Sequence, residues 1–148
     1  MADNGRVIYT AHAHVTGGRA AGHGRTSDGA LEVDLRAPVE TGGEGGGTNP
    51  EQLFAVGYAA CFEGAIKTIA RREKVDADAV SIDSSVSLGP GDDRSFTVAV
   101  GLDVTLPGFD DDRAVELVRA AHQVCPYSNA TRGNIDVTLT ANGRPVEG

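Results

Sequence analysis

Residues 49–72 read NPEQLFAVGYAACFEGAIKTIARR, and this stretch decides the fold. Its beginning predicts a helix N-terminus, because Asn49 can cap the first turn and Pro50 suits a position inside it. Thr48 and Glu51 also have the spacing of a capping box. The first half of the stretch carries no polar stripe, which predicts a helix buried on all sides. In so short a chain, such a helix must be wrapped by a sheet or by a second subunit.

The flanking sequence alternates between apolar and polar residues, as half-buried strands do. We expect strands over 6–15, 31–38, 79–90, 94–108 and 134–141, and a second helix over 110–124 that begins at three aspartates and ends one residue before Cys125. Residues 17–30 are rich in glycine and predict a polar connection with a turn at Asp28-Gly29. The pattern indicates an α+β fold in one domain, residues 1–148, with antiparallel strands and two helices.

Composition narrows the classes of function. The chain has 148 residues, 40% of them hydrophobic, and a formal net charge of −8. An acidic surface repels phosphate, so we expect no nucleic-acid partner. MADNGRVIYT has no basic segment followed by an apolar one, and the run LFAVGYAACF has about half the length of a bilayer span. We therefore expect no membrane partner and a cytoplasmic location.

The familiar ligand motifs are missing. The glycine-rich stretches contain no phosphate-binding loop and no dinucleotide fingerprint. His12 and His14 would share one face of a strand, but no third ligand follows at a metal-binding spacing. Neither cysteine belongs to a C-x-x-C motif. We expect no bound metal and no bound cofactor.

The two cysteines, Cys61 and Cys125, leave three interpretations open. Cys61 on a buried helix could be an inert small hydrophobe. The pair could form a structural disulfide, although disulfides in the cytosol are usually transient and catalytic. The pair could also react, which needs a cation near one thiolate. No Lys or Arg precedes Cys61 on its own helix, so that cation must come from elsewhere in the fold.

Four segments give the chain a family resemblance: TGGR (16–19), SDG (27–29), GTNPEQLFAVGYAACF (47–62) and VCPYSNATRGNIDVTLT (124–140). With these segments the chain resembles the organic hydroperoxide resistance proteins, the peroxidase branch of the osmotically-inducible-protein-C-like (OsmC-like) family. The resemblance implies antiparallel sheets wrapped around central helices in an intertwined homodimer, with two active sites at the subunit interface.

The resemblance also assigns roles to individual residues. Cys61 matches the peroxidatic cysteine and Cys125 matches the resolving cysteine. Arg19 matches the arginine that faces the thiolate, and Glu51 matches the carboxylate that holds this arginine. The expected substrate-binding residues are the apolar neighbours of the cysteines, Leu53, Phe54, Tyr58, Phe62 and Tyr127, some of which must be plain core. The sequence departs from the family pattern at Glu63, which at two residues after Cys61 should point to another face of the helix.

The implied function is a thiol-dependent peroxidase. It would reduce organic hydroperoxides, including those of fatty acids, to alcohols through a sulfenic acid and a Cys61–Cys125 disulfide. Dihydrolipoamide, or lipoylated subunits of dehydrogenase complexes, would be the external reductant. The alternatives are a redox sensor or binding protein of the same fold without turnover, a structural disulfide protein, and a Cys-His hydrolase with His23 or His122 as base.

Overall fold

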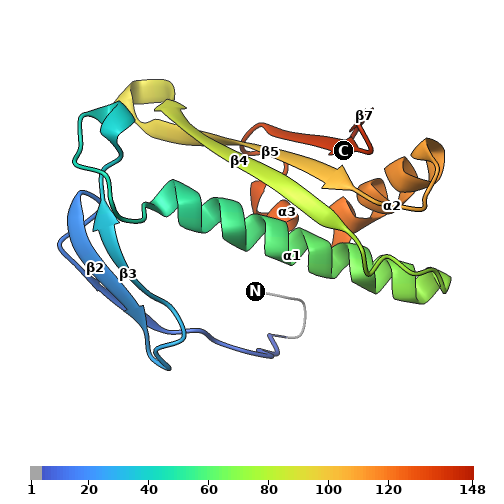
Figure 1. Cartoon of the computed structure of the whole chain (residues 1–148), viewed down its shortest axis with the longest axis horizontal. Coiled ribbons are helices and arrows are strands. Elements are labelled where there is room, and N and C mark those ends of the chain that lie inside the picture. The colour runs from blue at the N-terminus through green and yellow to red at the C-terminus, as the bar shows by residue number, and fades with distance from the viewer. Residues whose placement is uncertain (1–4) are drawn as a thin grey trace. The chain divides into compact units, whose positions relative to one another are not determined.

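The computed structural model describes residues 5–148, in two compact units that meet in sequence at Pro50 and Glu51 (Figure 1). The stretch MADNGRVIYT was considered above for an export signal, and its first four residues lie outside the described part. The first unit contains three strands and a short 3₁₀ turn. The second unit, Glu51–Gly148, contains the three α-helices and the other four strands.

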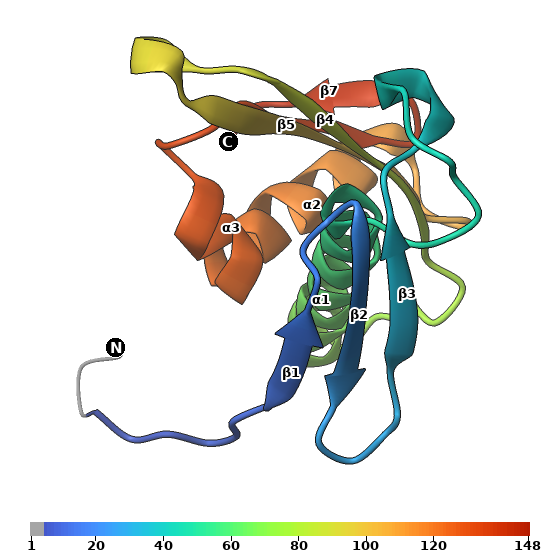
Figure 2. The same ribbon diagram turned by 90° about the vertical axis from the view of Figure 1, so that its left-hand side faces the viewer.

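The first unit is a three-stranded antiparallel sheet in the order β1-β2-β3 (Figure 2). The strands are β1 (Ala13–Thr16), β2 (Ala21–Thr26) and β3 (Glu32–Arg36), followed by the 3₁₀ turn η1 (Val39–Thr41). The strand predicted over 31–38 and the turn at Asp28-Gly29 are confirmed, with Gly29 at φ +75°.

Two expectations for this unit are wrong. Of the strand predicted over 6–15, only Ala13–Thr16 is regular, and Val7, Ile8 and Tyr9 are exposed. The connection predicted over 17–30 contains β2, although it is rich in glycine. A Cβ on Gly22 would lie 2.1 Å from the Gly18 carbonyl oxygen. Glycine therefore stands in β2 because the preceding turn folds closely over the strand.

The second unit is a four-stranded sheet with the helices on one face (Figures 1 and 2). The order along the sheet is β4-β5-β6-β7, antiparallel except for the parallel pair β5 and β6. The elements are α1 (Pro50–Glu73), β4 (Ser81–Pro90), the 3₁₀ turn η2 (Asp92–Arg94), β5 (Phe96–Thr105), α2 (Asp111–Val124), α3 (Pro126–Thr131), β6 (Val137–Ala141) and β7 (Arg144–Val146). The architecture is α+β, as the sequence predicts.

The core of this unit lies between the sheet and the helices. Alternate residues of the central strands, among them Val100, Leu102 and Leu139, face the helices and are at most 3% exposed. Polar residues such as Asp103 and Thr140 occupy the other face of the sheet and bond to each other. The period of two seen in the sequence therefore marks the buried face correctly.

Helix α1 is less buried than predicted. Tyr58, Phe62 and Ile66 are completely buried, but Val56 is 71% exposed and Ala60 is exposed one turn further on. An exposed stripe of apolar residues has the same hydropathy as a buried face, so the sequence pattern could not separate the two. By length and hydropathy α1 meets the criterion for a membrane span, a test that the core helix of a soluble protein also passes.

Candidate active site

The two cysteines meet within the second unit. Cys61 lies on α1, and Cys125 is the residue between α2 and α3. Their Sγ atoms are 3.6 Å apart although the residues are separated by 64 positions. Both are free thiols, Cys61 half-buried and Cys125 completely buried. A disulfide needs about 2.05 Å between the sulfurs, so a small approach of the two side chains suffices to bond them.

The surroundings of Cys61 within this unit favour the neutral thiol. Burial is the largest effect and raises the pKa of the Cys61 thiol above its ordinary value. The backbone N–H of Tyr127 donates a hydrogen bond to the sulfur and lowers the pKa in part. A reactive thiolate at this position therefore needs a positive charge beyond these contacts.

The sequence CPYSNATRGN, residues 125–134, contains the short helix α3, which no pattern in the sequence predicted. Pro126 occupies the first turn of α3, where its missing N–H costs nothing. Arg132 ties the end of α3 to α2, because one guanidinium nitrogen donates to the His122 carbonyl at 2.8 Å. Its other terminal nitrogen donates to the Asn129 side chain at 2.7 Å.

Buried polar side chains lie on either side of the cysteines in sequence. The Tyr58 hydroxyl is 2.8 Å from Ser128 Oγ and 3.1 Å from Thr131 Oγ1. His122 Nδ1 is also 2.8 Å from Ser128 Oγ. Burial and the nearby Arg132 lower the pKa of His122, which holds the imidazole neutral near pH 7. Ser128 and Thr131 were not among the predicted site residues, since nothing in the sequence marks which hydroxyls are buried.

An apolar cavity of about 490 Å³ lies beside α3. Its lining consists of Phe54, Val98, Pro126, Tyr127, Ala130, Thr131, Asn134 and Ile135. Of the expected substrate-binding residues, Phe54 and Tyr127 line the cavity, with their rings edge to face at 5.9 Å. Tyr58 and Phe62 are completely buried core residues, and Leu53 is half-buried on α1. The substrate-binding roles of these five residues stay predictions.

Arg19 and Glu51 lie in different units. Arg19 follows Gly17 and Gly18, both at positive φ, in the turn between β1 and β2. Glu51 stands in the first turn of α1, at the start of the second unit. The Asn49 and Pro50 signals thus correctly predict the helix start on which Glu51 lies. The approach of Arg19 to Cys61, and the support of Arg19 by Glu51, stay predictions.

The histidines do not form a metal site among the described residues. His23 Nε2 and Nδ1 contact Glu32 at 2.8 Å and Asp34 at 3.0 Å across an exposed face of the first sheet. No group of three metal-ligating side chains occurs within residues 5–148.

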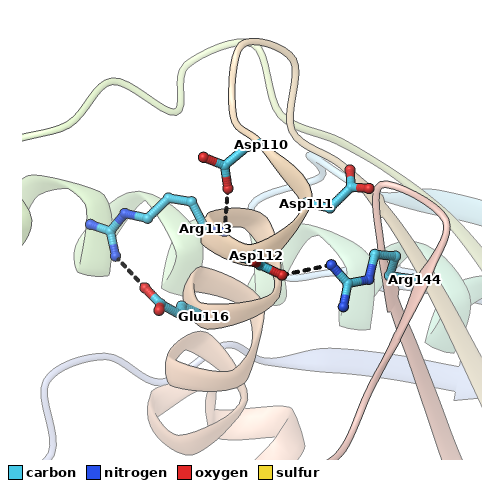
Figure 3. A pocket seen from close by; sticks show the side chains of 6 residues that line it. All are labelled: Asp110, Asp111, Asp112, Arg113, Glu116 and Arg144. Atoms are coloured by element: carbon cyan, nitrogen blue, oxygen red, sulfur yellow. Dashed lines mark hydrogen bonds and ion pairs between the residues drawn. The ribbon is translucent and has the colours of Figure 1, made fainter.

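A cleft at the start of α2 is lined by Asp110, Asp111, Asp112, Arg113, Glu116 and Arg144 (Figure 3). Several of these charges pair with each other, as Arg144 does with Asp112 at 2.7 Å.

Comparison with known proteins finds a family model that matches the chain and several relatives described as organic hydroperoxide resistance proteins. Residues 42–140 match the family model of the OsmC-like proteins. The chain is 57% identical to an organic hydroperoxide resistance protein of Xanthomonas axonopodis pv. citri (strain 306), over 95% of this chain and 99% of that one. It is 46% identical to the organic hydroperoxide resistance protein OhrB of Bacillus subtilis (strain 168), over 90% of this chain and 97% of that one.

Solved structures of organic hydroperoxide resistance proteins are also similar to this chain. An organic hydroperoxide resistance protein from Legionella pneumophila superposes with a TM-score of 0.86 at 51% identity, over 90% of this chain and 97% of that one. OhrB of Bacillus subtilis superposes with a TM-score of 0.83 at 45% identity, over 90% of this chain and 98% of that one.

Proposed function

The chain belongs to the OsmC-like protein family, in the branch of the organic hydroperoxide resistance proteins, and from this we propose that it detoxifies organic hydroperoxides as a thiol-dependent peroxidase. The observation that carries the proposal is the 3.6 Å contact between Cys61 Sγ and Cys125 Sγ. Two free thiols at this distance can be oxidised in sequence and joined without a change of fold.

The reaction balances in three steps. The Cys61 thiolate attacks one peroxide oxygen of ROOH, the O–O bond breaks, and the alkoxide takes a proton and leaves as ROH. Cys61 is then a sulfenic acid. The Cys125 thiol attacks this sulfur, the S–O bond breaks, and water leaves as the Cys61–Cys125 disulfide forms. A dithiol returns both cysteines to thiols by exchange and becomes a disulfide itself.

Arg19 supplies the positive charge in this proposal. An ordinary thiol is only about 3% ionised at pH 7, and burial raises the pKa of Cys61 further. A guanidinium about 4 Å away contributes about 4 kcal/mol at an effective dielectric constant of 20, enough to offset that effect. Glu51 acts as an orienter of Arg19, because its own negative charge opposes the thiolate. Arg19 also stabilises the charge that develops on the leaving alkoxide.

The cavity beside α3 supports an alkyl or aryl hydroperoxide as the substrate. Its walls are mostly apolar, and Tyr127 belongs to them while donating its backbone N–H to Cys61. An apolar tail lying on Phe54 and Tyr127 would leave its peroxide group near the sulfur. We expect Leu53 at the edge of this region, and Tyr58 and Phe62 behind it as core.

The remaining parts of the proposal concern partners. A second copy of the chain would cover the exposed stripe of α1 at Val56 and Ala60, as expected for a homodimer. Dihydrolipoamide or a lipoylated protein would be the dithiol reductant, and no bound cofactor takes part. A cytoplasmic location suits a cycle that depends on a reducing pool.

Steady-state turnover tests this function. Wild-type protein should consume cumene hydroperoxide with dihydrolipoamide as reductant, whereas the Cys61→Ser variant should not. The Cys125→Ser variant should reduce one equivalent and then stall. A redox sensor would form the disulfide once and fail to cycle, and a structural disulfide protein would leave the peroxide untouched. Turnover of an ester in place of the peroxide would indicate a hydrolase.

A further inference from the structure

Four buried side chains next to the cysteines form a hydrogen-bonded cluster that the proposed chemistry does not use. They are Tyr58, His122, Ser128 and Thr131, each at most 6% exposed. Besides the contacts given above, Thr131 Oγ1 donates to the backbone carbonyl of Ser128 at 3.4 Å. Buried polar groups are costly unless they are paired, so a cluster of this size is a specific feature of the fold.

A count of protons sets the direction of these bonds. The cluster has four contacts, from His122 to Ser128, from Ser128 to Tyr58, from Tyr58 to Thr131, and from Thr131 to the Ser128 carbonyl. Each contact needs one proton, and the three hydroxyl groups supply one each. The fourth proton must come from His122, whose neutral ring therefore carries its hydrogen on Nδ1. His122 donates at one end of the cluster, and a backbone carbonyl of α3 accepts at the other.

Three of the four cluster residues lie one helical turn from a cysteine in sequence. Tyr58 precedes Cys61 by one turn of α1, and residues three apart lie on the same face of a helix. His122 precedes Cys125 by three residues at the end of α2, and Ser128 follows it by three residues on α3. The hydrogen bonds thus join the three helices that carry or flank the sulfur atoms.

Helix α3 depends on such bonds for its position. It has six residues, too few to be stable alone, and its place must come from tertiary contacts. The N-cap residue Cys125 and the first turn of α3 supply two contacts to Cys61, the Cys125 thiol and the Tyr127 backbone N–H. A shift of α3 along α1 would therefore change both contacts together.

We propose that Tyr58, Ser128, Thr131 and His122 are positioning residues that hold α3 where the Cys125 thiol meets Cys61. This inference rests on the proposed function, because the Cys61–Cys125 disulfide is the bond that forms when Cys125 resolves the sulfenic acid. In this proposal the four residues act through the position of α3 and not on the peroxide itself, although Thr131 also lines the apolar cavity. They set the effective concentration of one sulfur at the other, on which the rate of disulfide formation depends.

The hydroxyl of Thr131 offers a matched pair of variants. Thr131→Val removes the hydroxyl at nearly constant shape, and Thr131→Ser keeps it. Each protein is mixed with one equivalent of tert-butyl hydroperoxide and excess dimedone, and intact mass gives the ratio of disulfide to Cys61–dimedone adduct. We expect Thr131→Val to lower this ratio about tenfold and Thr131→Ser to keep it within about threefold of wild type. Tyr58→Phe is the second variant, should Thr131→Val fail to fold, and should lower the ratio likewise.

A peroxide-free assay separates this inference from the proposed function. Diamide oxidises the reduced pair directly, and equilibration with a dithiothreitol redox buffer gives the stability of the disulfide. A tenfold loss of effective concentration raises the reduction potential of the pair by about 30 mV. Suppose that the wild type consumes no hydroperoxide while Thr131→Val and Thr131→Ser differ in the reduction potential of the Cys61–Cys125 pair. In that case the peroxidase proposal fails and the positioning role stands.

A destabilised control excludes a general loss of structure. Val104→Ala removes buried methyl groups from β5 and should lower the melting temperature without changing the disulfide-to-adduct ratio. The inference is overturned if Thr131→Val and Tyr58→Phe match wild type in both assays. It is also overturned if Val104→Ala shifts the ratio as much as they do.

Discussion

Tyr127 donates its backbone N–H to the sulfur of Cys61, and it does so from the short helix that begins directly after Cys125. The start of α3 and its N-cap residue Cys125 therefore provide both a hydrogen bond to the proposed thiolate and the thiol that would resolve its oxidised form. Burial still dominates and raises the pKa of Cys61, so this hydrogen bond alone does not make the thiol acidic. The missing positive charge is the central requirement of the proposed mechanism.

The first prediction concerns that charge. In a Cys125→Ser background, where Cys61 is the only cysteine, Arg19→Ala should raise the pKa of Cys61 by one or more pH units, about 1.4 kcal/mol per unit. The measurement is the rate of iodoacetamide alkylation as a function of pH. Arg25→Ala serves as the control, because Arg25 lies on β2 near Glu32 and has no proposed role. An alkylation profile that stays the same without Arg19 would remove this residue from the mechanism.

The second prediction concerns a hydroxyl group in the core. Ser84 Oγ is buried on the inner face of β4 and has no hydrogen-bond partner among the described residues. An unpaired buried hydroxyl costs about 1–3 kcal/mol, so Ser84→Ala should raise the free energy of unfolding by about 1 kcal/mol. Urea denaturation measures the change. The neighbouring Ser85 points to the exposed face, and Ser85→Ala should stay within about 0.5 kcal/mol of wild type. A destabilised Ser84→Ala variant would contradict the prediction.

Helix α1 shows how much of this fold could be predicted from the sequence. The predicted range of 49–72 agrees with the observed Pro50–Glu73 to within one residue, because capping signals and length both favour one answer. Strand β2 was missed because glycine disfavours strands by propensity, whereas in this fold the buried Gly22 admits a close turn. Strand β7 was missed although Asn142-Gly143, both at positive φ, is a strong hairpin signal.

The candidate site was predictable in its chemistry and not in its geometry. The sequence singled out Cys61 and Cys125 and the resemblance assigned their roles, whereas their contact across 64 positions is a result of the packing of α1 against α2 and α3. The cluster around Ser128 lay outside any local pattern, since Tyr58 reaches it over 70 positions. Long-range hydrogen bonds leave no periodic trace in a sequence, and these residues could be found only in the folded chain.

The third prediction concerns pH and the first sheet. Hydrogen bonds to Asp34 and Glu32 raise the pKa of His23 above 6.5, and the bond to His23 lowers the pKa of Asp34 below 3.8. The contribution of His23 to stability is complete below pH 6.5 and is lost as the pH rises through its folded-state value. The contribution of Asp34 is present above pH 3.8 and is lost as the pH falls. NMR titration of the His23 ring should give a pKa above 6.5 that falls in Asp34→Asn. A His23 pKa unmoved by that substitution would refute the pairing.

The last prediction concerns the exposed stripe of α1. Val56 is 71% exposed in the single chain, and a large apolar side chain at this position, followed one turn later by exposed Ala60, is typical of a surface covered by a partner. If a second copy covers it, Val56→Asp would bury two unpaired carboxylates in the dimer and dissociate it. Sedimentation velocity at micromolar concentration should show a dimer for wild type and a monomer for Val56→Asp.

Ser87→Asp, on the exposed face of β4, adds the same charge away from the stripe and should leave the dimer intact. A wild-type monomer would contradict the homodimer, and a dimeric Val56→Asp variant would place the interface elsewhere. The outcome also bears on the site. Should Arg19 come from the partner's first unit, the monomeric variant would show the same rise in the Cys61 pKa as Arg19→Ala, and alkylation of the two proteins would follow the same pH profile.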